Sequence, residues 1–600
     1  MKRAPSFCVA LVAVLSLAAP SVRAQSTDGK AGPAAPTMTK PAIQPFSRDL
    51  APELQDAVRP VTLPALDVAA LKAEDSARAA TGDKSMRVGA PRDLRVQLTD
   101  GRWDRLPGRG WLWRAEVVSP GAYAIRVHFS LMNLPDGARL LYFAPRYVDK
   151  IYGPISNRGP LKDGDFWSQP VVGDRMRIEY LVPGDEDQPP TGAPFMIDQL
   201  IHEYRSPLGD AGDIIPKEGN CHNDVTCYPA WASLSHAVAR IDYVDAGSGY
   251  TCTGQLLNDQ CGDLTPYFLT ANHCINNAGA ANSALIYWDY QTSVCNGIPP
   301  ALNTVPTSSY CTLLSNNANS DYSLLMVEGT LPGGRYWSGW TSGTPTDGTA
   351  VAGIHHPTGA YKRISFGNKG ASSLANHIRS NWYSGVTEPG SSGSGLFRQD
   401  NQQLTGQLHG GPSVCGGTML YDDYGAFAVT YPQISGYMAC GSDDAFYPNT
   451  TCGAAAVVGS GDWFGLVVRY ANDDWYSVNV PAGQRITVTI NFTNAWGDID
   501  MAMYDACGGS LVASSTGTGD SEQIDYENPG GATDFKIHVY LYSDTRNYYD
   551  LHVVVAPFPN LQANVTPPGF SSPAVPRDLN NSAFNNAPLT PTLEGTTNNT

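Results

Sequence analysis

Short stretches in which apolar and polar residues alternate recur along most of the chain, and a period of two predicts β-strands. From about residue 90 to 205 these stretches are separated by Pro, Gly and Asp turns. The same pattern returns from 237 to 409 and again from 473 to 542. Residues 65–82, which are rich in Ala, favour a short helix instead. The pattern predicts an all-β protein made of several units.

Length and composition predict where the chain divides. Its 600 residues exceed what one hydrophobic core organises. Lys2 and Arg3 precede an apolar run and a small-residue cleavage site at Ala24, as in a secretory signal peptide. We therefore expect a signal peptide (1–24), a propeptide (25–217) with a disordered Pro/Ala/Thr/Ser-rich leader and a β-rich domain from about 90, a central domain (218–442), a small β-sandwich (443–556) and a disordered tail (557–600).

The cysteines are concentrated in the central domain. Cys8 lies in the expected signal peptide, none of the other cysteines lies between residues 25 and 220, and most lie between 221 and 440. In an exported protein this distribution indicates disulfides, whereas a zinc site lacks a Cys-x-x-Cys pair with distant His partners. A cysteine-free domain before a cysteine-rich one suits a propeptide that is cut off at Lys217, in a polar junction. A permanent N-terminal domain is the alternative.

The charge narrows the classes of partner. A formal net charge of -17 argues against nucleic acid, because little is available to neutralise phosphates. An acidic pocket would instead suit a basic substrate. No other segment approaches the length of a membrane span, so we expect a secreted, extracellular protein that does not bind membranes.

One loop, residues 385–397, is poor in side chains and brings backbone N–H groups close to whatever binds there. Ser392 in this loop is a candidate nucleophile, although a flexible Gly/Ser turn is the simpler interpretation. A serine needs a base, and the base needs an orienting group. His273 follows an apolar strand and adjoins a cysteine, and Asp321 opens another apolar strand. The order His, Asp, Ser matches chymotrypsin rather than subtilisin or α/β-hydrolases.

Several motifs resemble trypsin-like serine proteases and, more narrowly, bacterial lysyl endopeptidase. Thr270-Ala-Asn-His-Cys resembles the histidine motif, and Gly390-Ser-Ser-Gly-Ser resembles the nucleophile loop. Further similar segments are Cys221-His-Asn-Asp-Val-Thr-Cys227, Tyr287-Trp-Asp-Tyr-Gln, Ile354-His-His-Pro and Gly406-Gln-Leu-His-Gly-Gly-Pro. The resemblance implies a chymotrypsin-like double β-barrel between residues 219 and 435. The segment from 443 to 556 resembles the bacterial pre-peptidase C-terminal domain.

The resemblance also implies a role for each residue of the motifs. Ser392 attacks the scissile carbonyl, His273 accepts its proton, and Asp321 fixes the histidine tautomer. The backbone N–H groups of Gly390 and Ser392 form the oxyanion hole. A turn histidine and a strand-capping carboxylate are the alternatives for His273 and Asp321.

Specificity is expected to come from residues further along the chain. In Tyr421-Asp-Asp-Tyr-Gly, the resemblance puts Asp422 at the base of the primary pocket, where a buried carboxylate requires a Lys or Arg side chain. A solvated Asp-Asp turn is the alternative. His409 and Gly410 are expected on the pocket wall. In the family this histidine stacks on a tryptophan that has no clear counterpart here, so an Arg-preferring or mixed enzyme remains an alternative to a Lys-preferring one.

Activation is expected to differ from that of trypsin. Ser391 occupies the position where many trypsin relatives carry the aspartate that receives the new N-terminus. The resemblance implies disulfides Cys221–Cys415, Cys227–Cys295 and Cys252–Cys274, which would order the site instead. Two further pairings are open possibilities: Cys261 with Cys311, and Cys452 with Cys507.

The expected protein is therefore a secreted serine endopeptidase that cuts after Lys or Arg and processes its own precursor. A catalytically inert secreted binding protein is the alternative from another class. Expected partners are protein or peptide substrates and the protein's own propeptide, and a monomer is expected. No cofactor or metal is expected, because Asp498 and Asp500 fit a solvated turn better than a calcium site.

Overall fold

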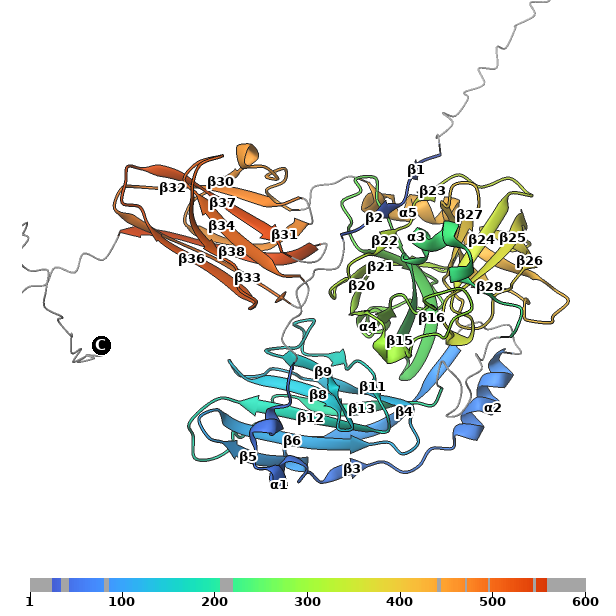
Figure 1. The fold of residues 1–600 in the computed structure, drawn as a ribbon, viewed down its shortest axis with the longest axis horizontal. Helices are drawn as coiled ribbons and strands as arrows, with labels where there is room; N and C mark the ends of the chain where they lie inside the picture. Colours follow the sequence, from blue (N-terminus) through green and yellow to red (C-terminus); the bar gives the residue numbers. More distant parts are fainter. Residues whose placement is uncertain are drawn as a thin grey trace, which may run out of the picture. The chain divides into compact units, whose positions relative to one another are not determined.

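The computed structural model describes residues 24–33, 43–79, 86–205, 219–439, 444–469, 472–494, 497–542 and 546–557. Residues 1–23 of the expected signal peptide, Lys217 and residues 558–600 of the expected tail lie outside these ranges, so the fold does not address the predictions made for them. Figure 1 follows the chain from a blue N-terminal domain through a green and yellow central domain to an orange and red C-terminal domain.

The N-terminal domain, for which the alternating pattern predicts a β-rich fold, is a β-sandwich. One sheet has the order β3-β6-β12-β8-β9 with β5 beside β6, and the other contains β10, β7, β13 and β4, with β11 beside β7. Apolar residues of both sheets form one core, which includes Trp113, Phe129 and Tyr180. The strands are β3 (Pro60–Thr62), β4 (Met86–Val96), β5 (Arg102–Leu106), β6 (Gly110–Val118), β7 (Ala124–Ser130), β8 (Arg139–Ala144), β9 (Tyr147–Ile155), β10 (Phe166–Trp167), β11 (Val171–Val172), β12 (Arg175–Val182) and β13 (Met196–Glu203).

The segment before this domain is structured, and the prediction of a disordered leader is wrong for its described residues. Residues 24–33 contain β1 (Ser26–Thr27) and β2 (Lys30–Ala31), which pair with strands of the central domain. The short helices η1 (Phe46–Asp49) and α1 (Pro52–Gln55) follow, and Phe46 and Leu54 pack against a small cluster that includes Leu112. The helix expected over 65–82 is α2 (Val68–Ala79). Composition misled the prediction because these contacts come from residues distant in the sequence.

The central domain contains two β-barrels, as the resemblance implies. In the first, β16 pairs with β15 and β17, and β17 continues through β21 to β20. β15 pairs with β18 and β18 with β19, and the chain runs from β19 almost directly into β20, which closes the barrel. These strands are β15 (Val238–Asp245), β16 (Ser248–Leu257), β17 (Tyr267–Thr270), β18 (Leu285–Tyr287), β19 (Thr307–Ser309), β20 (Cys311–Asn317) and β21 (Tyr322–Val327).

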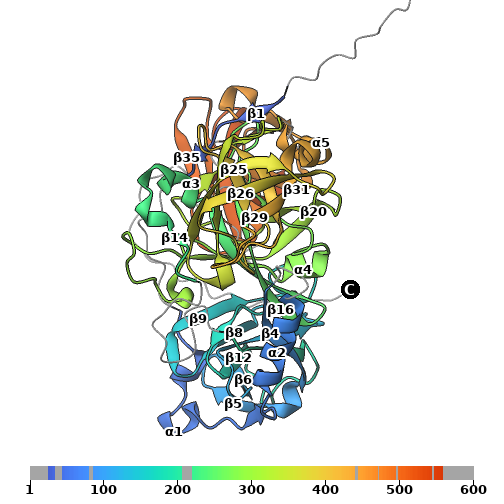
Figure 2. The ribbon, with the colours of Figure 1, turned by 90° about the vertical axis from the view of Figure 1, so that its right-hand side faces the viewer.

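The second barrel closes through a pairing between its last two strands. Its order is β28-β27-β24-β25-β26-β29, and β29 pairs back to β28. Figure 2 shows β25, β26 and β29 side by side. The strands are β24 (Ala350–His355), β25 (Arg363–Ala371), β26 (His377–Ser384), β27 (Gly395–Arg398), β28 (Leu404–Gly410) and β29 (Tyr421–Ala426). Short strands at the edges are β14 (Asn223–Asp224), β22 (Tyr336–Trp337) and β23 (Trp340–Thr341).

Helices contribute little to the central domain. They are α3 (Ala232–Ser235), α4 (Ala278–Asn282) and α5 (Phe427–Met438). The sequence pattern did not indicate α5, because Pro432 lies inside it and Gly436 near its end, and both residues are poor helix formers. Phe427 and Ile434 of α5 nevertheless pack into the main core of the domain. Tertiary packing, rather than propensity, therefore sustains this helix.

The C-terminal domain is a β-sandwich, as predicted. One sheet has the order β30-β32-β37-β34-β35 and the other β31-β38-β33-β36. The inward residues of both sheets form a single apolar core. The strands are β30 (Ala456–Val458), β31 (Gly461–Arg469), β32 (Asp474–Val480), β33 (Gln484–Phe492), β34 (Ile499–Tyr504), β35 (Leu511–Ser515), β36 (Ser521–Glu527), β37 (Thr533–Leu541) and β38 (Arg546–Pro557).

Candidate active site

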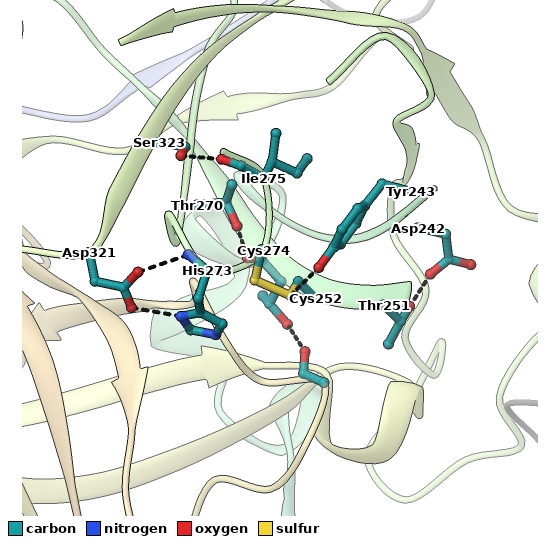
Figure 3. Close-up of a disulfide and its surroundings, with 12 residues drawn as sticks. Asp242, Tyr243, Thr251, Cys252, Thr270, His273, Cys274, Ile275, Asp321 and Ser323 are labelled. Atoms are coloured by element: carbon teal, nitrogen blue, oxygen red, sulfur yellow. Dashed lines mark hydrogen bonds and ion pairs between the residues drawn. A yellow bond between two sulfur atoms is a disulfide. The ribbon is translucent and has the colours of Figure 1, made fainter. Parts of the chain in front are cut away.

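Strand pairing brings His273 and Asp321 together. β17 ends just before the turn that carries His273, β21 begins directly after Asp321, and the two strands pair with Thr270 opposite Ser323. His273 Nδ1 lies 2.7 Å from Asp321 Oδ2, and the His273 backbone N–H donates to Asp321 Oδ1 at 2.9 Å (Figure 3). The neighbouring Cys274 is held to Cys252 of β16 by a disulfide, which fixes the turn.

Asp321 is buried, and its charge is stabilised by its neighbours. The side chain is almost inaccessible to solvent, and the residue has a positive φ of 52°. Burial alone would raise the pKa of this carboxyl. The charges and hydrogen bonds of His273 and His409 outweigh burial and hold the pKa well below its usual range. Asp321 is thus an anion that can orient and stabilise an imidazolium.

His409 binds the same carboxylate oxygen as His273. Its Nδ1 lies 2.7 Å from Asp321 Oδ2, and this hydrogen bond raises the pKa of His409. The His409 ring makes edge contacts with two other rings: with His273 at a centroid distance of 5.9 Å and with His377 at 4.9 Å. His377, at the start of β26, is a neighbour of His409 that motif reasoning did not identify. His377 and His409 are far apart in the sequence, so no local motif indicates that they are in contact.

The nucleophile loop lies against the strands that lead to His273. The carbonyl oxygen of Ser392 accepts from the Thr253 N–H of β16 at 2.8 Å. A Cβ placed on Gly393 would lie 2.7 Å from the Ala271 nitrogen, so only glycine permits this approach. Ser392 is fully buried, and its Oγ and His273 Nε2 have no hydrogen-bond partner in the described part of the chain. Catalytic hydrogen bonds commonly form only when substrate is bound.

Two backbone donors of this loop remain available. The N–H groups of Ser391, Gly393 and Ser394 donate to backbone carbonyls. Within the described residues, the N–H groups of Gly390 and Ser392 have no acceptor. Gly390 has a φ of 95°, in the region that favours glycine. Two unpaired donors beside a serine hydroxyl are suited to bind a developing oxyanion.

Asp422 lies on β29 and is fully buried, so the alternative of a solvated turn is wrong. Its Oδ2 accepts hydrogen bonds from Trp382 Nε1 at 2.6 Å, from Thr387 Oγ1 at 2.8 Å and from the Ser413 hydroxyl. These three donors are uncharged. A Cβ on Gly411 would lie 2.5 Å from Asp422 Oδ1 and would crowd the carboxylate.

Asp423, the next residue, forms a bidentate ion pair with an arginine. Arg379 Nε and Nη2 donate to its two carboxylate oxygens at 2.9 Å each, and the Arg379 guanidinium lies 3.8 Å from the centre of the Tyr421 ring. Asp423 also pairs in register with Gly410 across β28 and β29. The carboxylate of Asp423 is therefore already held by an arginine.

The base of the nucleophile loop is held by a network that motif reasoning missed. Ser391 Oγ lies 2.8 Å from His355 Nδ1 and accepts from the Glu388 N–H at 3.2 Å. Glu388 Oε2 lies 3.0 Å from His222 Nε2, and Glu388 Oε1 accepts from the Cys415 N–H at 3.3 Å. His222 immediately follows Cys221. The start of the central domain is thus tied to the loop that carries Ser392.

The described part of the chain contains disulfides Cys221–Cys415, Cys227–Cys295, Cys252–Cys274 and Cys452–Cys507. Cys261 also takes part in a disulfide, whereas Cys311 is a buried free thiol. The suggested pairing of Cys261 with Cys311 is therefore wrong. Cys311 opens β20 and lies in the core of the first barrel, in the same apolar cluster as Cys252 and Cys274.

In the C-terminal domain, Asp498 and Asp500 lie at β34 and are buried, so the expectation of a solvated turn is wrong. Burial and the nearby charges of Asp498 and Glu522 raise the pKa of Asp500 to about 6. Across the described residues, none of the helices is both long and apolar enough to span a bilayer.

Three family models match successive parts of the chain: the lysyl endopeptidase N-terminal domain at residues 62–203, the lysyl endopeptidase C-terminal domain at 215–425 and the bacterial pre-peptidase C-terminal domain at 473–548. Lysyl endopeptidase of Pseudomonas aeruginosa is 31% identical over 370 residues, which cover 57% of this chain and 79% of that protein.

Solved structures give weaker likenesses. A thermostable serine protease, AL20, is 12% identical with a TM-score of 0.26 and covers 34% of this chain and 97% of that one. The pre-peptidase C-terminal domain of collagenase from Bacillus anthracis is 16% identical with a TM-score of 0.15 and covers 17% of this chain and 94% of that one. At these scores neither structure informs the chemistry of the present chain.

Proposed function

The chain belongs to the lysyl endopeptidase family and is a serine endopeptidase, and we propose that it cleaves peptide bonds on the carboxyl side of Lys or Arg with Ser392 as nucleophile. The observation that carries this proposal is the pair of His273 and the buried Asp321 next to a serine loop with two unpaired backbone N–H groups. These are the parts that acyl transfer requires.

In the proposed mechanism, His273 Nε2 accepts the Ser392 hydroxyl proton as the oxygen attacks the scissile carbonyl. Asp321 holds the other ring nitrogen and stabilises the imidazolium. The N–H groups of Gly390 and Ser392 bind the oxyanion, and each such donor typically contributes about 10²–10³ in rate. His273 then returns the proton to the leaving amine, and water hydrolyses the acyl-enzyme by the same route.

Asp422 is the proposed determinant of basic specificity. Its carboxylate is fully buried on β29 and accepts hydrogen bonds from Trp382, Thr387 and Ser413. A Lys or Arg side chain bound beside it would pair its cation with a buried anion. His409 and Gly410 lie on the adjacent β28. An enzyme that prefers Arg is the second candidate, because His377 contacts His409 where the family resemblance implies a tryptophan.

The proposed enzyme is secreted and matures by removal of residues 25–217. The signal-like N-terminus and the disulfides support export. The match of residues 62–203 to the family's N-terminal domain supports a propeptide, and Lys217 is the proposed cut, because an enzyme that cleaves after basic residues would recognise it.

The first test replaces the nucleophile. The Ser392→Ala variant is expected to lose peptide hydrolysis and to retain its propeptide, because acyl transfer has no acceptor oxygen. An organophosphate reagent should label the parent protein at Ser392 and leave the variant unlabelled. Self-cleavage after Lys217 in purified Ser392→Ala protein would contradict the proposal, and an unlabelled parent would favour an inert binding protein.

The second test measures specificity with a mixed peptide pool whose cut sites are sequenced. Asp422→Asn should reduce kcat/KM for Lys and Arg sites by about 10²–10³-fold, the usual cost of removing one partner of a buried charge pair. Asp423→Asn is the matched control and should change kcat/KM much less, because Arg379 already neutralises that carboxylate. Equal losses in the two variants would reject Asp422 as the pocket anion, and the parent's Lys-to-Arg ratio decides between the two candidates.

A further inference from the structure

Residues 24–33, here called the leader strap, lie on the central domain as two short added strands. β1 pairs antiparallel with β23, with Ser26 opposite Thr341, and β2 pairs antiparallel with β22, with Lys30 opposite Trp337. At its far end the Gly32 N–H donates to the Arg335 carbonyl at 2.9 Å. The strap thus continues the central domain's own hydrogen bonding, although it belongs to the propeptide.

Side chains of the central domain bind the backbone of the leader strap. Asn258 Nδ2 donates to the Asp28 carbonyl at 2.8 Å, and Gln403 Nε2 donates to the Thr27 carbonyl at 3.3 Å. The first residue expected after signal cleavage, Gln25, exchanges hydrogen bonds with Ser342 in both directions. Because these side chains donate hydrogen bonds to backbone carbonyls of the strap, the contact depends on the extended conformation of the strap.

Glycines allow the leader strap to sit this close. A Cβ on Gly339 of the central domain would lie 2.5 Å from the Thr27 oxygen, 2.6 Å from the Gly29 nitrogen and 2.7 Å from the Asp28 carbonyl carbon. All three nearest atoms belong to the strap. On the other side, a Cβ on Gly32 would overlap the ring of the buried Trp337. The two surfaces are therefore fitted to one another.

The propeptide touches the central domain at a second, separate place. β4 of the N-terminal domain pairs with β16, with Gly89 opposite Gly249 and Met86 opposite Thr251. β16 belongs to the first barrel, whereas β23, which receives β1, pairs with β28 of the second. The same propeptide thus holds both barrels through backbone hydrogen bonds.

We propose that the leader strap is a docking strand that keeps the cleaved propeptide bound to the mature protease, with the groove formed by β22, β23 and Gly339 as its receptor. The inference rests on the proposed cleavage in the 206–218 junction, but not on which enzyme makes the cut. Once the junction is open, the propeptide is released only when both β4 and the strap detach. The strap therefore slows release of the propeptide.

The test uses the full chain with Ser392→Ala, in which a recognition sequence for an added site-specific protease replaces residues 207–213. The protein is immobilised through its C-terminus, the junction is cut, and the dissociation rate of the propeptide is measured. Self-processing plays no part in this design, so a failure of the strap and a failure of the proposed catalysis are distinguished. Hydrogen exchange of the uncut chain reports whether Ser26, Thr27, Trp340 and Thr341 amides are protected.

Gly339→Ala and, separately, Gly32→Val should each speed dissociation on the order of tenfold or more, because each displaces several backbone hydrogen bonds at once. The double variant should add little, since both changes break one contact. Gly436→Ala is the matched control, because a Cβ there meets nothing within 4 Å. Gly32→Val cannot disturb the fold of the mature protease, which lacks that residue.

Two results would overturn the inference. One is a dissociation rate that is the same in the parent and both glycine variants. The other is exchange of the Ser26 and Thr27 amides in the parent at the rate of an unstructured chain. Loss of protection in Gly339→Ala at Trp340 and Thr341, with β4 and β16 still protected, would support the strap as an independent site.

Discussion

At the scale of single residues, the most informative atom is Asp321 Oδ2, which receives hydrogen bonds from both His273 and His409. Two histidines therefore depend on one anion, and the pKa of His409 is raised by it. In the proposed mechanism, a protonated His409 next to Asp321 competes with the imidazolium of His273. The protonation of His409 is thus coupled to the reaction through a shared oxygen.

This coupling predicts a change in pH dependence. In His409→Gln, a neutral side chain replaces one whose pKa is raised by Asp321, so less positive charge lies beside the reacting imidazole. The acidic limb of kcat/KM should therefore move to higher pH by about half a unit or more. The pH–rate profile of the mature enzyme checks this. His552→Gln, which removes another histidine of a His–Asp pair in the C-terminal domain, is the control. An unshifted profile in His409→Gln would reject the coupling.

At the scale of elements, the nucleophile loop shows what sequence motifs can and cannot reveal. Ser392, His273 and Asp321 could be selected because each lies in a local pattern: a glycine loop, a strand end before a cysteine, and a strand start. His222 and His355 lie in segments that resemble the family, and Glu388 lies in the loop itself. Their contacts could not be predicted, because the partners lie 166, 36 and 27 residues away in the sequence. The same reason hid the contact between Trp382 and Asp422.

The His222–Glu388 contact predicts energetic coupling between the start of the central domain and the loop. The His222 side chain is fully inaccessible and that of Glu388 only 13% exposed, so the pair is weakly screened. His222→Asn and Glu388→Gln should each lower stability and kcat/KM. The double variant should lose less than the sum, with a coupling free energy of about 0.5–3 kcal/mol. Thermal unfolding and kinetics of the four proteins measure it, and strictly additive losses would show that the contact is incidental.

At the scale of the whole molecule, carboxylates face each other between the N-terminal domain and the central domain. Glu203 ends β13 of the N-terminal domain, and its pKa is raised to about 7 by burial and by Asp242 of β15, against the opposing effects of Arg126 and Arg240.

The leader was predicted to be disordered, and this was wrong because its order comes from partners more than 300 residues away, such as Thr341. Composition indicates whether a segment tends to be disordered by itself, but it does not indicate whether another part of the chain offers a surface on which the segment becomes ordered.

The pKa of Glu203 predicts that the propeptide binds more tightly in acid. Below the ordinary value of 4.5 the carboxyl is neutral both bound and free, so burial carries no ionic penalty. Between pH 4.5 and about pH 7, Glu203 is protonated in the bound propeptide but ionised in the free one, so the affinity falls as the pH rises. Above about pH 7 Glu203 is ionised in both forms, and the affinity no longer changes with pH. Dissociation of the cleaved Ser392→Ala complex at pH 5 and pH 8 should differ about tenfold or more. Glu203→Gln should remove most of this difference, and a pH dependence that survives in Glu203→Gln would assign it to other groups.

The buried thiol of Cys311 constrains the order in which the protease assembles. In the folded barrel, burial raises the pKa of this thiol far above its ordinary value, so it forms little thiolate and cannot attack a neighbouring disulfide. In the unfolded chain the Cys311 thiol is as reactive as that of any other cysteine, and it can form a wrong disulfide with Cys252 or Cys274. Correct oxidation therefore depends on β20 being sequestered early. We therefore expect the first barrel to collapse before its disulfides are complete, and β4 of the N-terminal domain, which pairs with β16, is placed to assist that collapse.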